Sequence, residues 1–389
     1  MTNLAFCRPC SVLCTSIFVT LAGLTSIVFA QGVSNTAVNI AVILPLSSNQ
    51  SDIGLAYFKG AQACLKEVNA RKIFGRTINL VPNDDLHVPS MAVEILKETL
   101  AAKKESEQAF ALMGVVGDSI ADALLPVAVA AKMPVIGPLV GSEKNMAYAG
   151  QNGVFTLRRS DKEMLSAMLH QLTAMRFRSV SVVFVNDTSG LARLAMLEQL
   201  IKDKGLVLVS KQGVAANVNV FEQDASVLLS KPADAILSMA GALSSAALLK
   251  TIKQKGFPGL FMAPSTVGVR SLSTHASKEV VRGAIMGFPI TSVADGRMSV
   301  VREFRKRMGG DSAEFADDDA AFEGCTAALV LAEGLRRAGQ SLTRDGFIKG
   351  LNSRPVQVDD ISFTFGSKPA QPSAAASLAI FGSNGKLVQ

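Results

Sequence analysis

The chain has 389 residues, of which 49% are hydrophobic and 18% are charged, and its formal net charge is +7. This length allows two or three domains, and the composition is that of a globular protein rather than of a membrane protein with many spans. The positive charge is scattered. No block of Lys and Arg with interleaved aromatic residues supports binding to nucleic acid.

The first thirty residues differ from the rest of the chain. Arg8 is the only charged residue before Asp52, and the apolar run 17–30 ends in Val28-Phe29-Ala30. A basic start, an apolar middle and small residues before the cut are typical of a secretory signal peptide. Residues 1–30 are therefore predicted to be removed on export to the periplasm. A retained membrane anchor is the alternative, since an uncharged run of this length could just span a bilayer.

Three of the five cysteines lie within this predicted leader, which leaves Cys64 and Cys325 in the mature chain. Each of these two residues lies in an apolar helical pattern, where a buried thiol is the common outcome. We therefore expect two free thiols. One disulfide is the alternative in an oxidising compartment.

The chain after the leader alternates short β-rich runs with helical patterns. The expected strands are 38–44, 77–81, 109–116, 135–136 and 154–157, and the expected helices between them are 54–70, 91–102 and 121–131. Strands that alternate with helices of this length indicate right-handed βαβ crossovers and a parallel sheet.

The same alternation then starts again. The expected helices are 162–175, 191–204, 221–229 and 244–255, and the expected strands are 179–185, 207–209, 235–239 and 260–262. Further helices are expected at 300–308, 320–338 and 344–351, followed by strands at 361–365 and 376–381. Two successive α/β sets of similar size predict two similar lobes. Ligands of such sheets bind beyond the carboxyl ends of the strands, in the loops there.

One of these loops, Gly117-Asp118-Ser119-Ile120-Ala121, lies between an expected strand and an expected helix. It superficially resembles the nucleophile elbow of hydrolases, but it lacks the final glycine and has no suitably placed His. A Ser beside the free N–H groups of a helix N-terminus can instead receive an anion or carboxylate. Capping of the helix is the alternative, and the two roles are compatible.

Two acidic clusters have structural interpretations. Asn83-Asp84-Asp85-Leu86-His87 offers too few ligands for a metal and is interpreted as a turn and helix cap. Asp317-Asp318-Asp319 precedes an expected helix, whose N-terminus negative charge stabilises. The sequence contains no P-loop and no dinucleotide-binding glycine fingerprint. We therefore expect no metal, no cofactor and no catalysis.

A series of short motifs runs through the mature chain. Its members include Ile40–Pro45, Lys59-Gly60-Ala61-Gln62, Pro134–Pro138, Val154–Arg158 and Phe322-Glu323-Gly324. In order and spacing the series resembles type I periplasmic solute-binding proteins, the branched-chain amino-acid-binding type that serves ABC importers. The resemblance extends from about residue 38 to residue 388.

This resemblance implies an α/β fold of two Rossmann-like lobes with central parallel sheets, joined by a hinge of three crossovers (periplasmic binding protein-like I). Lobe 1 would comprise 37–157 plus 288–355, and lobe 2 would comprise 158–287 plus 356–389. The implied function is capture of a small polar solute by lobe closure and its delivery to an ABC permease. A ligand-sensing subunit of a signalling or chemotaxis system is the alternative.

The loops that match those of the family supply the candidate ligand-binding residues. They are Asp118, Ser119, Val140, Gly141, Ser142, Ser160, Asp161, Asp187, Ser189, Ser265 and Thr266. Relatives usually place Ser or Thr where Asp118 stands and an acid where Ser265 stands. A carboxylate at Asp118 would repel a ligand carboxylate unless its pKa rose or a cation intervened. The solute is therefore expected to be amino-acid-like, an organic acid or an amide.

The leader generates a first testable prediction. N-terminal sequencing of periplasmic material should find Gln31 as the first residue, because the small residues at Val28 and Ala30 mark the cleavage site. An intact Met1 on the exported protein would contradict cleavage and favour a retained anchor.

Overall fold

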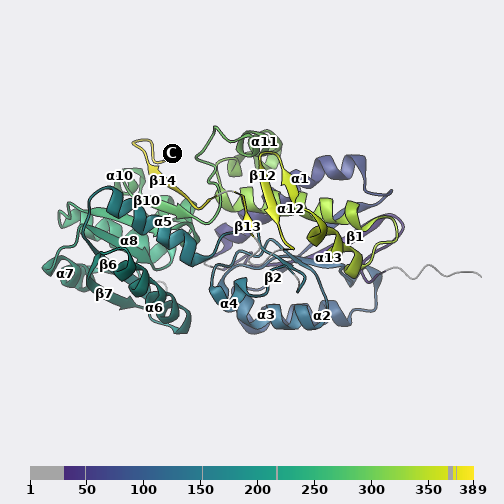
Figure 1. The fold of residues 1–389 in the computed structure, drawn as a ribbon, viewed down its shortest axis with the longest axis horizontal. Coiled ribbons are helices and arrows are strands. Elements are labelled where there is room, and N and C mark those ends of the chain that lie inside the picture. The colour runs from purple at the N-terminus through teal and green to yellow at the C-terminus, as the bar shows by residue number, and fades with distance from the viewer. Residues whose placement is uncertain (1–29, 49, 151, 216–217, 367–370, 374) are drawn as a thin grey trace, which may run out of the picture.

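The computed structural model describes residues 30–48, 50–150, 152–215, 218–366, 371–373 and 375–389. Two lobes lie side by side along the long axis of the molecule (Figure 1). Residues 1–29 of the predicted signal peptide lie outside the described residues. Within the described part, no helix is long and apolar enough to cross a membrane.

The sheet of lobe 1 has five strands in the order β2-β1-β3-β4-β5, and every pair of neighbours is parallel. The strands are β1 (Ala37–Leu44), β2 (Thr77–Asp84), β3 (Ala111–Gly114), β4 (Val135–Ile136) and β5 (Val154–Phe155). The helices of this lobe are α1 (Ser51–Arg71), α2 (Pro89–Ala101), α3 (Asp118–Ala130), α4 (Glu143–Met146), α11 (Ser299–Arg307), α12 (Asp319–Ala338) and α13 (Arg344–Ser353).

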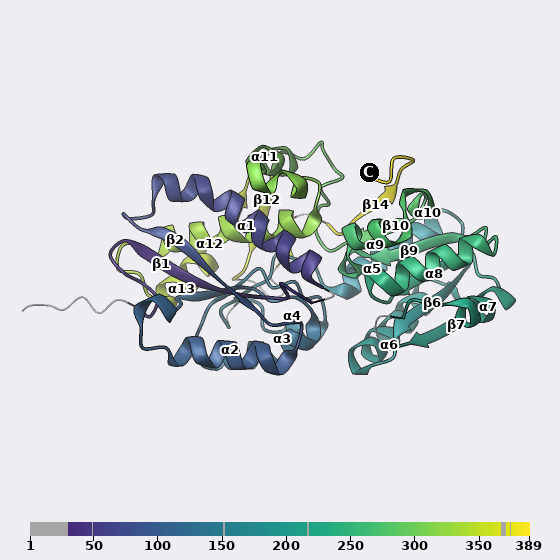
Figure 2. The ribbon, with the colours of Figure 1, turned by 180° about the vertical axis from the view of Figure 1, so that it is seen from behind.

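Alternation of side chains along β1 divides the interior of lobe 1 into two cores. Ile40 and Val42 pack into the core that contains α1 and α12, whereas Ala41 and Ile43 pack into the core with α2 and α3. Seen from behind, α2 and α3 accordingly cover the face of the sheet opposite α1 (Figure 2). A strand with both faces buried reads as a continuous apolar run, as β1 does.

The sheet of lobe 2 repeats this topology and extends it, in the order β15-β14-β10-β9-β8-β6-β7. Its strands are β6 (Ser179–Val185), β7 (Val207–Val214), β8 (Ala235–Met239), β9 (Leu260–Pro264), β10 (Ile285–Phe288), β14 (Ser377–Phe381) and β15 (Leu387–Val388). Its helices are α5 (Asp161–Ala174), α6 (Thr188–Asp203), α7 (Glu222–Ser230), α8 (Ala242–Gln254), α9 (Val269–Ala276) and α10 (Lys278–Val281). Strands β6 to β10 are parallel, and β14 adds to β10 in the antiparallel sense.

The expected alternation of strands and helices is confirmed, but β10 was not expected from the sequence. It is a short, fully buried strand, Ile-Met-Gly-Phe. A short, continuous apolar run has no hydrophobic periodicity that would distinguish a buried strand from a buried helical segment. Its position between β9 and β14 completes the sheet of lobe 2.

The chain passes between the lobes at 157–161, at 288–290 and between 365 and 377. The prediction assigned everything from residue 356 onward to lobe 2. In the structure, β11 (Val356–Val358) and β12 (Ile361–Thr364) pack into the core of lobe 1, as does Phe365, and they form a small sheet with β13 (Gln371–Pro372). Only β14 and β15 return to lobe 2. The apolar alternation of 356–365 indicated a buried strand but not which core would bury it.

Helices α1 and α12 pack against each other at unusually short range. A Cβ atom on Gly60 would overlap the carbonyl group of Ala321, and one on Gly324 would overlap that of Tyr57. This approach brings the Cα atoms of Cys64 and Cys325 to 5.3 Å, and the two residues form a disulfide. The expectation of two free thiols is therefore wrong. The cysteines are 261 residues apart, and only the helix pairing shows that they meet.

The disulfide generates a second prediction. The Cys64→Ala/Cys325→Ala double variant should lose about 2–5 kcal/mol in the free energy of unfolding, measured with urea, because the bridge restricts the unfolded chain over a long loop. Wild-type protein unfolded without reductant should show no reactive thiol from this pair. Two titratable thiols in the oxidised protein would contradict the bridge.

Candidate functional site

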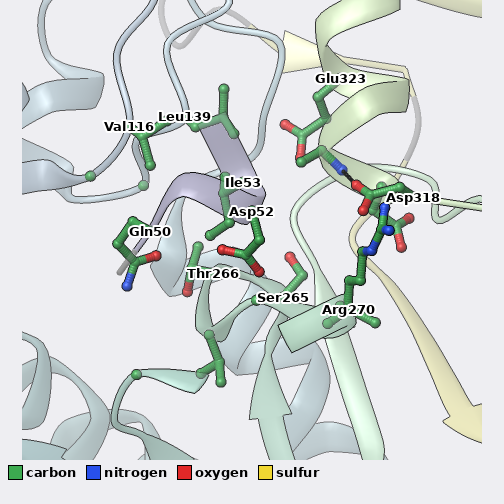
Figure 3. A pocket seen from close by; sticks show the side chains of 18 of the residues that line it. Gln50, Asp52, Ile53, Val116, Leu139, Ser265, Thr266, Arg270, Asp318 and Glu323 are labelled. Carbon is green, nitrogen blue, oxygen red and sulfur yellow. Dashed lines mark hydrogen bonds between the residues drawn. The ribbon is translucent and has the colours of Figure 1, made fainter. Parts of the chain in front are cut away.

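A cavity of about 850 Å³ lies between the lobes and is lined by both of them. Lobe 1 contributes the start of α1, the loop after β3 and the start of α12, while lobe 2 contributes the starts of α6 and α8 and the segment after β9. Figure 3 shows Asp52 and Ile53 of α1 near Ser265 and Thr266 of the segment after β9. Apart from the start of α12, these positions follow the carboxyl ends of strands, where parallel sheets place their ligands.

The structure separates the sequence-predicted site residues into two groups. Those that line the cavity are Asp118, Ser119, Gly141, Asp187, Ser189, Ser265 and Thr266. Val140, Ser142, Ser160 and Asp161 lie behind this lining, among residues that do not border the cavity.

Two of the residues behind the lining have evident structural roles. The Ser160 Oγ accepts a hydrogen bond from the Glu163 N–H and forms a capping box at the start of α5. The Ser142 Oγ accepts one from the Asn145 N–H at 3.3 Å and caps α4. A hydroxyl group used in this way leaves less capacity for a ligand.

Asp118, the first residue of α3, makes the densest set of hydrogen bonds at the cavity. Its Oδ1 accepts from the backbone N–H groups of Gly141 (3.3 Å) and Ser142 (3.0 Å) and from the Asn145 Nδ2 (2.9 Å). Burial acts to raise the pKa of Asp118, but the hydrogen bonds from Asn145 and Ser142 and the charge of Arg193 outweigh it and lower the pKa. Asp118 is therefore an anion at neutral pH.

The cation at Asp118 is Arg193, which projects from α6 of lobe 2. Its Nη2 donates to the Asp118 Oδ2 at 3.0 Å, and its Nε donates to the Asp161 Oδ2 at 2.9 Å. Burial raises the pKa of Asp161, and the charge of Arg193 opposes that rise. The guanidinium thus bridges the cleft between a carboxylate of lobe 1 and one at the start of lobe 2. Arg193 carries no signal in the sequence, because it lies inside a helix and in no motif.

A second Arg–carboxylate pair lies beside the first. The Arg158 Nη2 donates to the Glu323 Oε1 at 2.8 Å, and the Arg158 Nε donates to the other oxygen, Oε2. Both side chains are buried, with exposed fractions of 6% and 7%. Such a two-point pair holds Arg158, at the first crossing between the lobes, against α12. Both residues occur in the family-like motifs, but their contact joins distant parts of the chain.

Acidic side chains at the start of α12 also line the cavity. The Asp318 Oδ1 caps α12 by accepting from the N–H groups of Ala320 (2.9 Å) and Ala321 (3.2 Å), as the sequence interpretation of this cluster proposed. Burial raises the pKa of Asp318 to about 6. Asp319 accepts from the Val293 N–H at 2.8 Å, and burial raises its pKa to about 8. Both residues also line the cavity, which the helix-cap interpretation did not include.

Asp52 is a further residue of the cavity lining, and it lies outside the predicted site residues. It lies in the first turn of α1, and a Cβ atom on Gly268 would be 3.4 Å from its Oδ2. The carboxylate of Asp52 therefore lies close to lobe 2, although its backbone belongs to lobe 1.

The acidic segment at the end of β2 leads into a turn at Leu86 and His87, as interpreted, but its interpretation as a helix cap is wrong, because the N-cap of α2 is Val88 and no side chain caps that helix. Asp84 accepts from the N–H groups of Leu46 (2.8 Å) and Leu86 (3.0 Å), and Asp85 accepts from the His87 N–H at 2.8 Å. His87 lines the cavity, and burial lowers its pKa. Among the described residues, no group of three or more His, Cys, Asp or Glu is placed to hold a metal ion.

Two similar lobes and the cavity that they share define a two-lobed binding protein. The family described as periplasmic binding protein matches residues 37–386, and the chain belongs to this family, whose members are not enzymes. No curated protein matches the chain.

Several solved structures share this fold. A substrate-binding periplasmic protein from Ralstonia solanacearum is 24% identical with a TM-score of 0.79, over 90% of this chain and 99% of that chain. A leucine-binding protein from Thermotoga maritima is 20% identical with a TM-score of 0.77, over 90% and 97% of the two chains. A solute-binding protein of an ABC transporter from R. palustris, in complex with benzoate, is 19% identical with a TM-score of 0.77, over 90% and 95%.

The raised pKa of Asp319 generates a third prediction. The folded state keeps a proton that the unfolded state releases above the ordinary Asp pKa near 4, so stability should fall as the pH rises from about 4 to about 8 and level off above that. The Asp319→Asn variant keeps an acceptor for the Val293 N–H and should lack this fall.

Urea unfolding of both proteins between pH 5 and pH 9 measures the effect. The difference in the free energy of unfolding between wild type and Asp319→Asn should change by at most about 1.4 kcal/mol per pH unit. Asp85 and Asp318, whose pKa values are also raised, titrate in both proteins, so the difference reports the titration of Asp319 together with its charge coupling to Asp318. Parallel curves would contradict a protonated Asp319.

Proposed function

We propose that this protein is the exported solute-binding component of an ABC importer and captures a small polar solute by closure of its two lobes. The observation that carries the proposal is the cavity between the lobes, with Asp52 and Asp318 on the lobe 1 side and Ser265 and Thr266 on the lobe 2 side. A solute bound there contacts both lobes. Membership of the periplasmic binding protein family supports the same conclusion.

The size and polarity of the cavity favour a small molecule. A volume of about 850 Å³ lies within the usual range for small-molecule sites. Its lining combines apolar surface, such as Ile53 and Leu139, with hydroxyl and carboxylate groups. Apolar walls with a few convergent polar groups bind a solute through burial and orient it through hydrogen bonds.

Closure follows from where these groups lie. A solute that contacts Asp52 and Ser265 at the same time has its full set of partners only when the lobes are together. Contacts made only in the closed form shift the equilibrium toward that form. A permease that recognises the closed arrangement of both lobes would then receive the loaded protein rather than the empty one.

The proposal generates a fourth prediction. In a thermal-shift screen of amino acids, organic acids, amides and polar neutral compounds, one class should raise the unfolding temperature of the wild-type protein, because a ligand stabilises the state that binds it. With that compound, Asp52→Asn and Ser265→Ala should each weaken binding by about 0.5–3 kcal/mol, measured by calorimetry.

The matched control is Ser226→Ala on α7, an exposed serine remote from the cavity lining, which should bind as the wild type does. Small-angle scattering should show a smaller radius of gyration with the solute than without it. An unchanged radius under saturating solute would contradict closure, and unchanged affinity in both cavity variants would contradict the site.

A further inference from the structure

A set of hydrogen-bond donors in lobe 1 is arranged to hold one carboxylate. The donors are the backbone N–H groups of Gly141 and Ser142 and the Nδ2 of Asn145, and all three converge on one oxygen. Asn145 is fully buried, so its amide is fixed in place by its surroundings. Arg193 adds a guanidinium from lobe 2 at the other oxygen. We call these four groups the carboxylate receptor.

The group that occupies this receptor belongs to the chain itself. The carboxylate of Asp118 accepts from every one of these donors, at distances of 2.9 to 3.3 Å. A carboxylate has about four acceptor positions, so Asp118 has little capacity left. The lowered pKa of Asp118 agrees with a site that stabilises negative charge.

The two guanidinium groups near Asp118 are already paired with carboxylates of the chain, so neither is free to pair with a carboxylate of the solute. The Arg193 guanidinium is divided between Asp118 and Asp161, and Arg158 is paired at two points with Glu323. A solute carboxylate brought to this end of the cavity would face Asp118 and Glu323, with Asp161 behind them, and only two cations that already have partners. The cost of removing it from water would not be recovered there.

We propose that Asp118 is an internal carboxylate that fills the carboxylate receptor of lobe 1 and so determines specificity, by excluding solutes that present a free carboxylate at this end of the cavity. The group that the solute presents at this end of the cavity is then an amide, a neutral polar group or a cation. This inference deepens the proposed function and rests on it for the meaning of the solute, but the receptor can be tested without knowing the solute.

The experiment empties the receptor and supplies a free carboxylate. Asp118→Ala removes the internal carboxylate and leaves the donors of Gly141, Ser142, Asn145 and Arg193 without it. The variant should unfold at a lower temperature than the wild type, and sodium acetate should restore part of the loss. At about ten times its dissociation constant, acetate should raise the midpoint by roughly 2–4 °C, whereas wild type should not respond.

Three comparisons make the result specific. Acetamide has the shape of acetate without its charge and should not restore the variant, and sodium chloride controls for ionic strength. The matched variant is Asp234→Ala. The Asp234 carboxylate accepts from the N–H groups of Arg178 and Ser179 and from the Ser179 Oγ, but it lies outside the cavity lining and has no guanidinium among these partners. It should be destabilised without acetate rescue.

Specificity is tested directly with benzoate and benzamide, a carboxylate and its amide of nearly equal size. Calorimetry should show that benzoate binds Asp118→Ala at least tenfold more tightly than wild type, with no such gain for benzamide. If Asp118→Ala does not fold, Asp118→Ser provides the same test, because Ser is too short to reach the receptor as a carboxylate does.

The inference is overturned if acetate fails to stabilise the folded variant, if acetamide or chloride stabilises it equally, or if wild type responds as the variant does. Failure of the proposed function looks different. In that case acetate rescues Asp118→Ala, but no solute from the screen stabilises the wild-type protein.

Discussion

The ion pairs that the Arg193 guanidinium makes with Asp118 and Asp161 are the interactions on which the cavity around Asp118 depends. Each carboxylate lies at the start of a helix, and burial acts to raise both pKa values. Without a cation between them, two such groups cannot both remain charged at short range. Arginine suits this position because its planar fork donates in two directions at once and its charge is not lost at any ordinary pH. The same bridge joins the two lobes.

The scaffold explains why these groups meet. Lobe 1 uses the strand order β2-β1-β3-β4-β5, and lobe 2 repeats it as β7-β6-β8-β9-β10. Two such sheets with their carboxyl ends facing each other place the loops of both lobes around one cavity. Gly141 lies at the seam, where an added Cβ atom would overlap the side chain of Asp161, and its carbonyl accepts from the Asp161 N–H at 2.7 Å. The absence of a side chain therefore lets the two lobes touch.

The pairing of α1 with α12 makes the part of the cavity wall that these two helices form rigid. The disulfide between Cys64 and Cys325 and the close approach at Gly60 and Gly324 fix these helices to each other. Asp52 lies in the first turn of α1, and Asp318 caps α12, so the helix pair also fixes the spacing of these two acidic groups. A polar site built on two linked helices keeps its geometry better than one built on a free loop.

The sequence by itself determined the two sets of strands and helices, because hydrophobic periodicity is a local property. It also placed Asp118, Ser189 and Ser265 in loops after strands, where parallel sheets put their ligands, but it did not include the start of α12. It also singled out Asp118 as a departure from its relatives. Only the tertiary structure decided what that departure means. Arg193 has no local signal, the partner of Cys64 is 261 residues away, and residues 356–365 could have been buried in either lobe. The partners of Arg193 and Cys64 and the burial of residues 356–365 all depend on which distant surfaces of the chain pack together. This packing is determined by burial and charge pairing over the whole folded chain rather than within any one segment.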